Sequence, residues 1–134
     1  MTVSEADEAI EALRPVAEAR RALRLLLVHG SRARGEAHEG SDWDLAYLAD
    51  PDLDAGELHA AASEALGTSA VDLVDLARAS ALLRFEAARS ARCVHEREPG
   101  AHEAFVLEAT LFWCDVEPVL RRAYAEVLAS LPER

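Results

Sequence analysis

The stretch that decides the fold is Leu23–Leu48, LRLLLVHGSRARGEAHEGSDWDLAYL. Its first part, Leu23–His29, is a short aliphatic run closed by Gly30, which is typical of a buried strand that ends in a turn. Its last part, Asp42–Leu48, alternates acidic or small residues with large apolar ones, as a strand with two different faces does. We therefore predict two strands here, the first of them central in a sheet.

Upstream and downstream of this stretch the pattern changes to helices. The run from Ser4 to about Arg24 favours a helix, which we expect Pro15 to kink or divide into two segments. After the second strand, Asp54 can cap a helix that runs to about Leu66 and stops at Gly67. The segment from Ala70 to Leu76 then supplies a third apolar strand, which carries two acids.

The last third of the chain continues the alternation of helix and strand. A helix over Ala79–Arg89 and a short strand over Arg92–Glu96 precede a turn at Pro99-Gly100. A long helical region follows, and we expect Pro118 to bend or split it. Its apolar stripe from Phe105 to Leu131 is expected to pack into the protein's own core. The predicted fold class is α/β (α+β), with helices around a few strands and a C-terminal helical region.

Composition limits the size of the fold and the classes of partner. The 134 residues suit one domain, 1–134, with a core built mainly from Ala, Leu and Val because only 5% of residues are aromatic. A net charge of -11 opposes capture of a nucleic-acid backbone, so no direct nucleic-acid partner is expected. We expect a local positive pocket for phosphate near the Gly30-Ser31 turn, made by Arg20, Arg21, Arg24, Arg32 and Arg34.

Nothing in the sequence predicts export or a membrane span. The two cysteines, Cys93 and Cys114, have no metal-type spacing, and no charged start followed by an apolar run marks a signal peptide. No apolar stretch approaches the roughly 18 to 20 residues that a membrane-spanning helix needs. A cytoplasmic protein with no membrane partner is expected.

Three acids are candidates for catalysis and metal binding. Because strand side chains alternate, Asp42 and Asp44 project from one face, about 6.5 to 7 Å apart, and can face one Mg²⁺ centre. Trp43 points the other way, which favours a place in the core over stacking on a base. Asp72 lies in an apolar run, where a carboxylate needs a partner or a metal, so it is expected to ligate a second metal and act as general base. Asp75 is expected to face away from Asp72.

The turn after the first strand is a candidate triphosphate site. Ser31–Glu36 can form a short helix whose free N–H groups and positive dipole end point at a ligand. Gly30 permits close backbone approach, and the Ser31 hydroxyl can cap the helix or contact a phosphate oxygen. Arg34 is either the nearby cation or an ordinary solvent-facing arginine.

The order of these features resembles a known family. Gly-Ser after an aliphatic strand, Asp-x-Asp on the next strand and an acid in a third follow the pattern of the DNA polymerase beta nucleotidyltransferase superfamily, over roughly Leu23 to Leu76. In particular, GSRARGEAHEGSDWDL resembles the minimal nucleotidyltransferases, antitoxin partners of HEPN-domain toxins. The resemblance implies a small mixed β-sheet flanked by helices, with Mg²⁺ and ATP as cofactors. It also implies transfer of AMP to a tyrosine hydroxyl of a cognate HEPN toxin by a two-metal mechanism.

By the same resemblance each candidate residue takes a role. Gly30 and Ser31, with Arg34, bind the nucleotide, Asp42 and Asp44 are metal ligands, and Asp72 is the third acid. Two alternatives stay open. The chain could neutralise its toxin by stoichiometric binding with little or no catalysis, or it could act on another acceptor such as an aminoglycoside, which the lack of an obvious second substrate domain argues against. If the chain is an antitoxin, any apolar surface of the C-terminal helix that the core does not cover is a candidate toxin contact.

Overall fold

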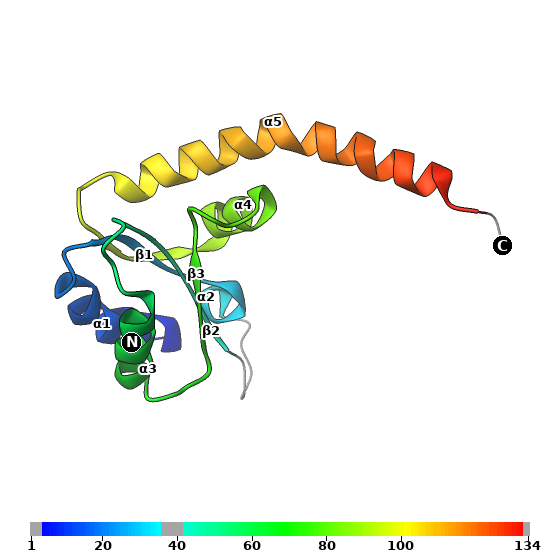
Figure 1. Ribbon diagram of the computed structural model, residues 1–134. Coiled ribbons are helices and arrows are strands. Elements are labelled where there is room, and N and C mark those ends of the chain that lie inside the picture. Colours follow the sequence, from blue (N-terminus) through cyan, green and yellow to red (C-terminus); the bar gives the residue numbers. More distant parts are fainter. Residues whose placement is uncertain (1–3, 36–41, 133–134) are drawn as a thin grey trace.

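A four-stranded mixed sheet with helices on both faces forms the body of the protein (Figure 1). The computed structural model describes residues 4–35 and 42–132. The strands are β1 (Leu23–His29), β2 (Trp43–Ala49), β3 (Val71–Asp75) and β4 (Arg92–Glu96), in the order β3-β2-β1-β4. β1 pairs antiparallel with β2 and β4, and β2 pairs parallel with β3. The predicted α/β class and the central place of β1 are confirmed.

One face of the sheet is covered by α1 (Glu5–Glu18) and α3 (Ala55–Leu66). Both helices begin at side chains that accept backbone N–H groups, Ser4 in a capping box and Asp54 bonded to the N–H of Glu57. α3 ends at Gly67 in the left-handed conformation, as the sequence predicts. The apolar stripe of α1, which includes Leu13, packs on this face with the large residues of β1 and β2, Leu26, Val28, Trp43, Leu45 and Tyr47.

The opposite face is covered by α4 (Ala81–Ser90) and the beginning of α5 (Ala101–Ser130). Phe105 and Ala109 of α5 pack there with Leu25 and Leu27 of β1 and with Ala46 of β2. The two cores follow the period of two along each strand, since alternate residues point to opposite sides. Trp43 is 5% exposed and belongs to the α1 face, which confirms its predicted place in the core.

Pro15 has a smaller effect than the sequence suggests, whereas α5 is bent and not split (Figure 1), which is one of the two outcomes expected of Pro118. α1 is one helix that runs through Pro15 and ends at Glu18, so the expected second segment does not form. Pro15 lies in the last turn, where it removes one hydrogen bond, and the burial of Leu13 and Ala17 on either side keeps that turn on the core. α5 likewise continues through Pro118 as one bent helix (Figure 1).

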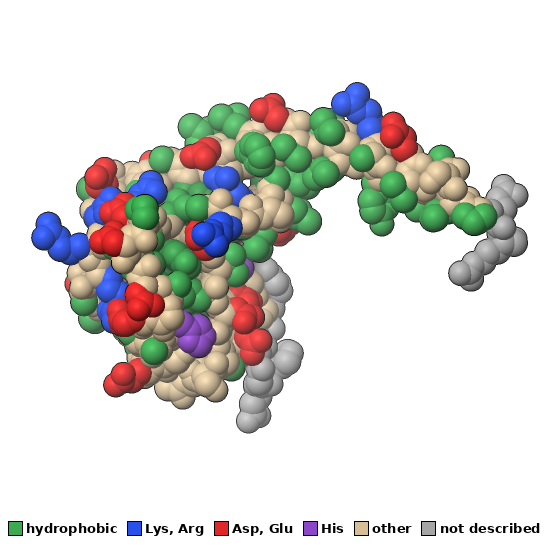
Figure 2. All heavy atoms as spheres, viewed as in Figure 1, with side chains coloured by type: hydrophobic (Ala, Val, Ile, Leu, Met, Phe, Trp, Pro, Cys, Tyr) green, Lys and Arg blue, Asp and Glu red, His purple; other side chains and the backbone are tan. Residues whose placement is uncertain are grey.

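The second half of α5 does not pack into the protein's own core. Ala109 is the last buried residue of the helix, and from Pro118 to Ser130 every residue is exposed. The expectation that the whole stripe to Leu131 is core is therefore wrong, because the helix is longer than the sheet that it covers. Figure 2 shows hydrophobic side chains along this projecting half. No helix in the described ranges combines the length and apolarity needed to cross a bilayer.

Candidate active site

Two of the three predicted acids lie side by side at one end of the sheet. In the parallel pairing of β2 with β3, Asp44 is the direct partner of Asp72, so their side chains leave the same face of neighbouring strands. On its other side Asp44 pairs with His29, the last residue of β1. Asp42 comes immediately before β2, two residues from Asp44, and is exposed. The structure thus brings Asp44 and Asp72 together and places Asp42 next to them in the chain.

Gly30 makes room for the Asp44 carboxylate. Its φ of +77° is in the left-handed region that side chains disfavour, and a Cβ there would collide with Oδ2 of Asp44 and lie 3.1 Å from its Cγ. The sequence argument assigned this glycine to close approach of a phosphate. The structure adds a second reason, since only glycine leaves space for the acid of the neighbouring strand.

The turn after β1 forms a shorter helix than predicted. α2 spans Gly30–Arg34 and ends at Gly35 in the left-handed conformation. His29 is the N-cap residue and makes no side-chain capping hydrogen bond. Ser31 is therefore inside the first turn and does not cap it, because the helix starts one residue earlier than expected. The predicted segment beyond Gly35, including Glu36, and the side chain of Arg34 lie outside the part of the chain that is described.

Arg32 joins α2 to the strand that carries the acids. Its guanidinium lies over the Trp43 ring, 4.6 Å from the ring centroid to Cζ, and forms an ion pair with Glu5 of α1. The sequence argument missed this contact. A usable signal was present, since strand alternation puts Trp43 on the face where a helix must pack, but nothing in the sequence says which cation reaches it.

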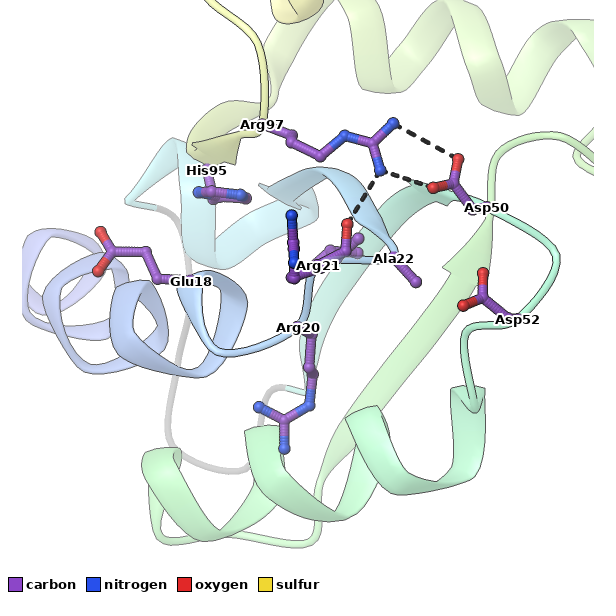
Figure 3. Close-up of a pocket in the computed structure, with 9 residues that line it drawn as sticks. Glu18, Arg20, Arg21, Ala22, Asp50, Asp52, His95 and Arg97 are labelled. Carbon is purple, nitrogen blue, oxygen red and sulfur yellow. Dashed lines mark hydrogen bonds and ion pairs between the residues drawn. The ribbon is translucent and has the colours of Figure 1, made fainter.

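The expected cluster of five arginines does not form around the site. Arg20, Arg21 and Arg24 lie before or at the start of β1, whereas Gly30 follows its end, so a seven-residue strand of about 23 Å separates them. Arg20 and Arg21 instead line a pocket of about 530 Å³ at the opposite end of the sheet (Figure 3). This pocket is remote from Asp44 and is not the predicted site.

Two ion pairs lie in or beside that remote pocket. Arg97 donates to Oδ2 of Asp50 at 2.6 Å and to the carbonyl oxygen of Arg21 at 2.9 Å (Figure 3). Arg20 donates through Nε to Glu57 at 2.8 Å. The neighbouring arginines hold the pKa of the Asp50 and Glu57 carboxyls below their ordinary values. Ion pairs of this kind tie β4, α3 and the loops together.

The acidic pair at the other end has the chemistry of a divalent-metal site. Carboxylate oxygens on neighbouring strands are hard donors that suit Mg²⁺, which also keeps water and substrate phosphates as ligands. Within residues 4–35 and 42–132, no three His, Cys, Asp or Glu side chains form a ready-made metal cluster. An ion held here would therefore take part of its shell from phosphate and water. Asp75 is on the other face, as expected, where its Oδ1 accepts the N–H of Ala77 at 3.0 Å.

Comparisons with known proteins agree with this geometry. Residues 11–100 match the family model described as polymerase beta, nucleotidyltransferase. No curated protein sequence matches the chain. Among solved structures, a chain of a toxin–antitoxin crystal structure with AMP-PNP is 26% identical, with a TM-score of 0.72, and the match covers 92% of this chain and 98% of that one. A chain of the MntA-HepT toxin–antitoxin structure is 24% identical, with a TM-score of 0.65 and coverage of 92% and 96%.

A third solved structure contains a modified toxin. It is the complex of tri-AMPylated Shewanella oneidensis HEPN toxin with MNT antitoxin, and one of its chains is 24% identical to this one, with a TM-score of 0.65. The match covers 92% of this chain and 95% of that one. These likenesses confirm the fold over nearly the whole chain.

Proposed function

This chain belongs to the polymerase beta nucleotidyltransferase family, and from that premise we propose that it is an antitoxin that transfers AMP from ATP to a tyrosine hydroxyl of a cognate HEPN toxin. The observation that carries the proposal is the direct pairing of Asp44 with Asp72 at the sheet end where Gly30 leaves room for a carboxylate. An intact pair of acids in this position fits catalysis better than a binding role alone.

The comparisons support a toxin as the acceptor. The toxin–antitoxin structure with AMP-PNP contains an ATP analogue, and its similar chain matches this one over almost its full length. The tri-AMPylated HEPN toxin of the Shewanella complex carries the kind of modification that the proposed reaction makes. The chain, as a single catalytic domain over 1–134, would supply ATP binding and transfer, and the toxin would supply the hydroxyl.

In the proposed reaction the tyrosine oxygen attacks the α-phosphorus of ATP, the bond from that phosphorus to the β-phosphate oxygen breaks, and pyrophosphate leaves. Asp72 accepts the proton of the hydroxyl as general base. Asp42 and Asp44 would hold Mg²⁺ through carboxylate oxygens, with Asp72 as a ligand of a second ion. When bound, the two ions offset phosphate charge and orient the in-line displacement.

The turn after β1 holds the nucleotide in this proposal. Gly30 and Ser31 would present backbone N–H groups and a hydroxyl to the triphosphate, and Arg34 would add a cation. Arg32, fixed between Trp43 and Glu5, supports the turn from behind. These roles rest on position and on family resemblance.

A co-expression experiment tests the proposal. The genes next to this chain's are searched for a HEPN-domain protein, which is produced with the wild type or with an Asp42→Asn/Asp44→Asn double variant, and its intact mass is measured. We expect one or more additions of AMP on tyrosine with the wild type and none with the double variant. A toxin that stays unmodified when it is co-expressed with the wild-type chain would contradict the transferase proposal, and the family assignment would still hold.

The exposed half of α5 favours a second candidate function, neutralisation by stoichiometric binding. A long apolar helix face can hold a partner without any chemistry. In that case the Asp42→Asn/Asp44→Asn variant should still rescue growth of cells that produce the toxin. Loss of rescue in a variant that still folds and binds the toxin would reject this alternative.

A further inference from the structure

The direction of α5 is set by the strand order. β4 runs antiparallel to β1 and ends beside its beginning, since Glu96 pairs with Leu25. Only four residues separate the end of β4 from the start of α5, which runs back along the sheet toward the end that carries Gly30 (Figure 1). Its 30 residues span about 45 Å, roughly twice the length of the seven-residue β1. The helix therefore extends well past the sheet at its Gly30 end.

The projecting half lies on the same side of the sheet as the acids. Phe105 and Ala109 fix the beginning of α5 on the face that includes Ala46. Asp44 is two residues from Ala46 on β2 and therefore leaves that same face, as does its partner Asp72. A molecule bound to the side of the projecting half that faces the sheet would consequently lie beside the acidic pair, beyond the end of the strands.

Apolar side chains line one face of the projecting half. Its large exposed residues on this face are 50% to 70% exposed and form what we call the α5 stripe: Leu120, Tyr124, Val127, Leu128 and Leu131. With Trp113 and Glu117 they follow alternating steps of four and three, the spacing that packs against another helix. At on the order of 100 Å² each, these five side chains supply over half of the roughly 800 Å² that one partner contributes to a standard interface.

We propose that the α5 stripe is the docking surface for the acceptor protein, which presents an apolar helical face to it with its target hydroxyl toward Asp44 and Asp72. This inference rests on the proposed function and adds where the acceptor binds. The alternative occupant, a second copy, is disfavoured because each chain carries a net charge of -11. The same acidity favours a partner with basic residues around its apolar face. Docking at the stripe brings the acceptor to the catalytic end.

The test uses substitutions that change the stripe without touching the site. Leu120→Asp places a charge in the middle of the stripe, and Tyr124→Glu does so independently one turn later. Ala129→Asp is the matched control, because Ala129 is equally exposed but lies on the opposite face of the helix. The probe is a HEPN-domain protein found by searching the genes next to this chain's, and its affinity is measured by calorimetry. AMP-PNP affinity and the far-UV circular dichroism of each variant are measured alongside.

We expect Leu120→Asp and Tyr124→Glu each to weaken toxin binding by roughly 30-fold or more, as loss of a central apolar anchor does. Ala129→Asp should bind within about threefold of the wild type, and all three should bind AMP-PNP normally. Toxin affinity unchanged in both stripe variants would overturn the proposal. A neighbouring gene that encodes no such protein would overturn the choice of partner.

Two further outcomes separate this inference from the proposed function. If the wild type binds the toxin through the stripe but adds no AMP, the docking surface stands and the transferase proposal fails. If the stripe variants add AMP as fast as the wild type at low toxin concentration, the docking surface is wrong and the transferase proposal stands. Sedimentation of the chain alone should show a monomer. A dimer that Leu120→Asp dissociates would assign the stripe to a second copy instead.

Discussion

The two ends of the central sheet treat their charged residues differently. At the start of β1, Asp50 and Glu57 form ion pairs with Arg97 and Arg20, which line the pocket there. At the end of β1, Asp44 and Asp72 are direct neighbours of like charge, and within the described ranges no side chain forms an ion pair with Asp72. Like charges placed side by side cost stability, so a fold keeps them where a ligand uses them. The contrast supports the second end as the place of the proposed active site, although the pocket of about 530 Å³ lies at the first.

The largest expected effect comes from removing one acid at each end. Asp44→Asn should lower the rate of AMP transfer by about 10³-fold or more, because it removes a carboxylate that would hold the metal and its phosphate ligands. Asp50→Asn, at the other end, should leave that rate unchanged and lower the melting temperature. Initial rates by mass spectrometry and thermal unfolding measure both. An AMP-transfer rate of Asp44→Asn within tenfold of the wild type would contradict a functional difference between the two ends of the sheet.

Asp72→Asn should lower the transfer rate by about 10²- to 10⁴-fold, the range for loss of a general base. The melting temperature should stay equal or rise slightly, since the substitution removes repulsion with Asp44 and breaks no ion pair. Opposite changes in rate and stability would sharpen the distinction between the two ends. A marked loss of stability in this variant would instead give Asp72 a structural role.

Gly30→Ala should lower the transfer rate by about 10²-fold, because the new Cβ displaces the Asp44 carboxylate. It should also cost about 1 to 2 kcal/mol of unfolding free energy, since alanine is strained at positive φ. Gly67→Ala is the control with the same strain, as Gly67 has a φ of +68° and open space around it. Equal transfer rates in the two variants would show that the space beside Asp44 is unimportant.

The smallest effect concerns the pH dependence of stability. The folded-state pKa of Asp50 and of Glu57 is lowered from the ordinary values of 3.8 and 4.5 by the adjacent arginines. Their stabilising contribution is therefore full above those ordinary values and is lost as the pH falls through the lowered ones. Urea unfolding should show constant stability from pH 7 to about 5 and a decline below about 4.5.

Arg97→Met should make the decline of stability at low pH shallower, because the arginine that lowers the pKa of Asp50 is then absent. Identical slopes for wild type and Arg97→Met would contradict a contribution of the Asp50–Arg97 pair to this decline, to which the lowered pKa values of Asp7, Glu96 and Glu117 also contribute.

The strands and the limits of α3 could be predicted because their signals are local. The aliphatic run before Gly30 predicts both limits of β1 correctly, and Asp54 and Gly67 predict both ends of α3. The start of α2 could not be predicted, because Gly30 rather than Ser31 adopts the first helical position. The length of α1 depended on burial around Pro15, and burial is set by partners that are distant in sequence.

By itself the sequence determined which residues are candidates for the proposed chemistry, since spacing along strands puts Asp42, Asp44 and Asp72 in a definite order with Gly30-Ser31. Only the tertiary structure decided which of them meet, because strand register, not spacing, makes Asp44 the neighbour of Asp72. It also moved Arg20, Arg21 and Arg24 to the other end of the sheet and left half of α5 uncovered. Local patterns fix which face a side chain takes, whereas strand order and the relative lengths of packed elements fix what lies opposite it.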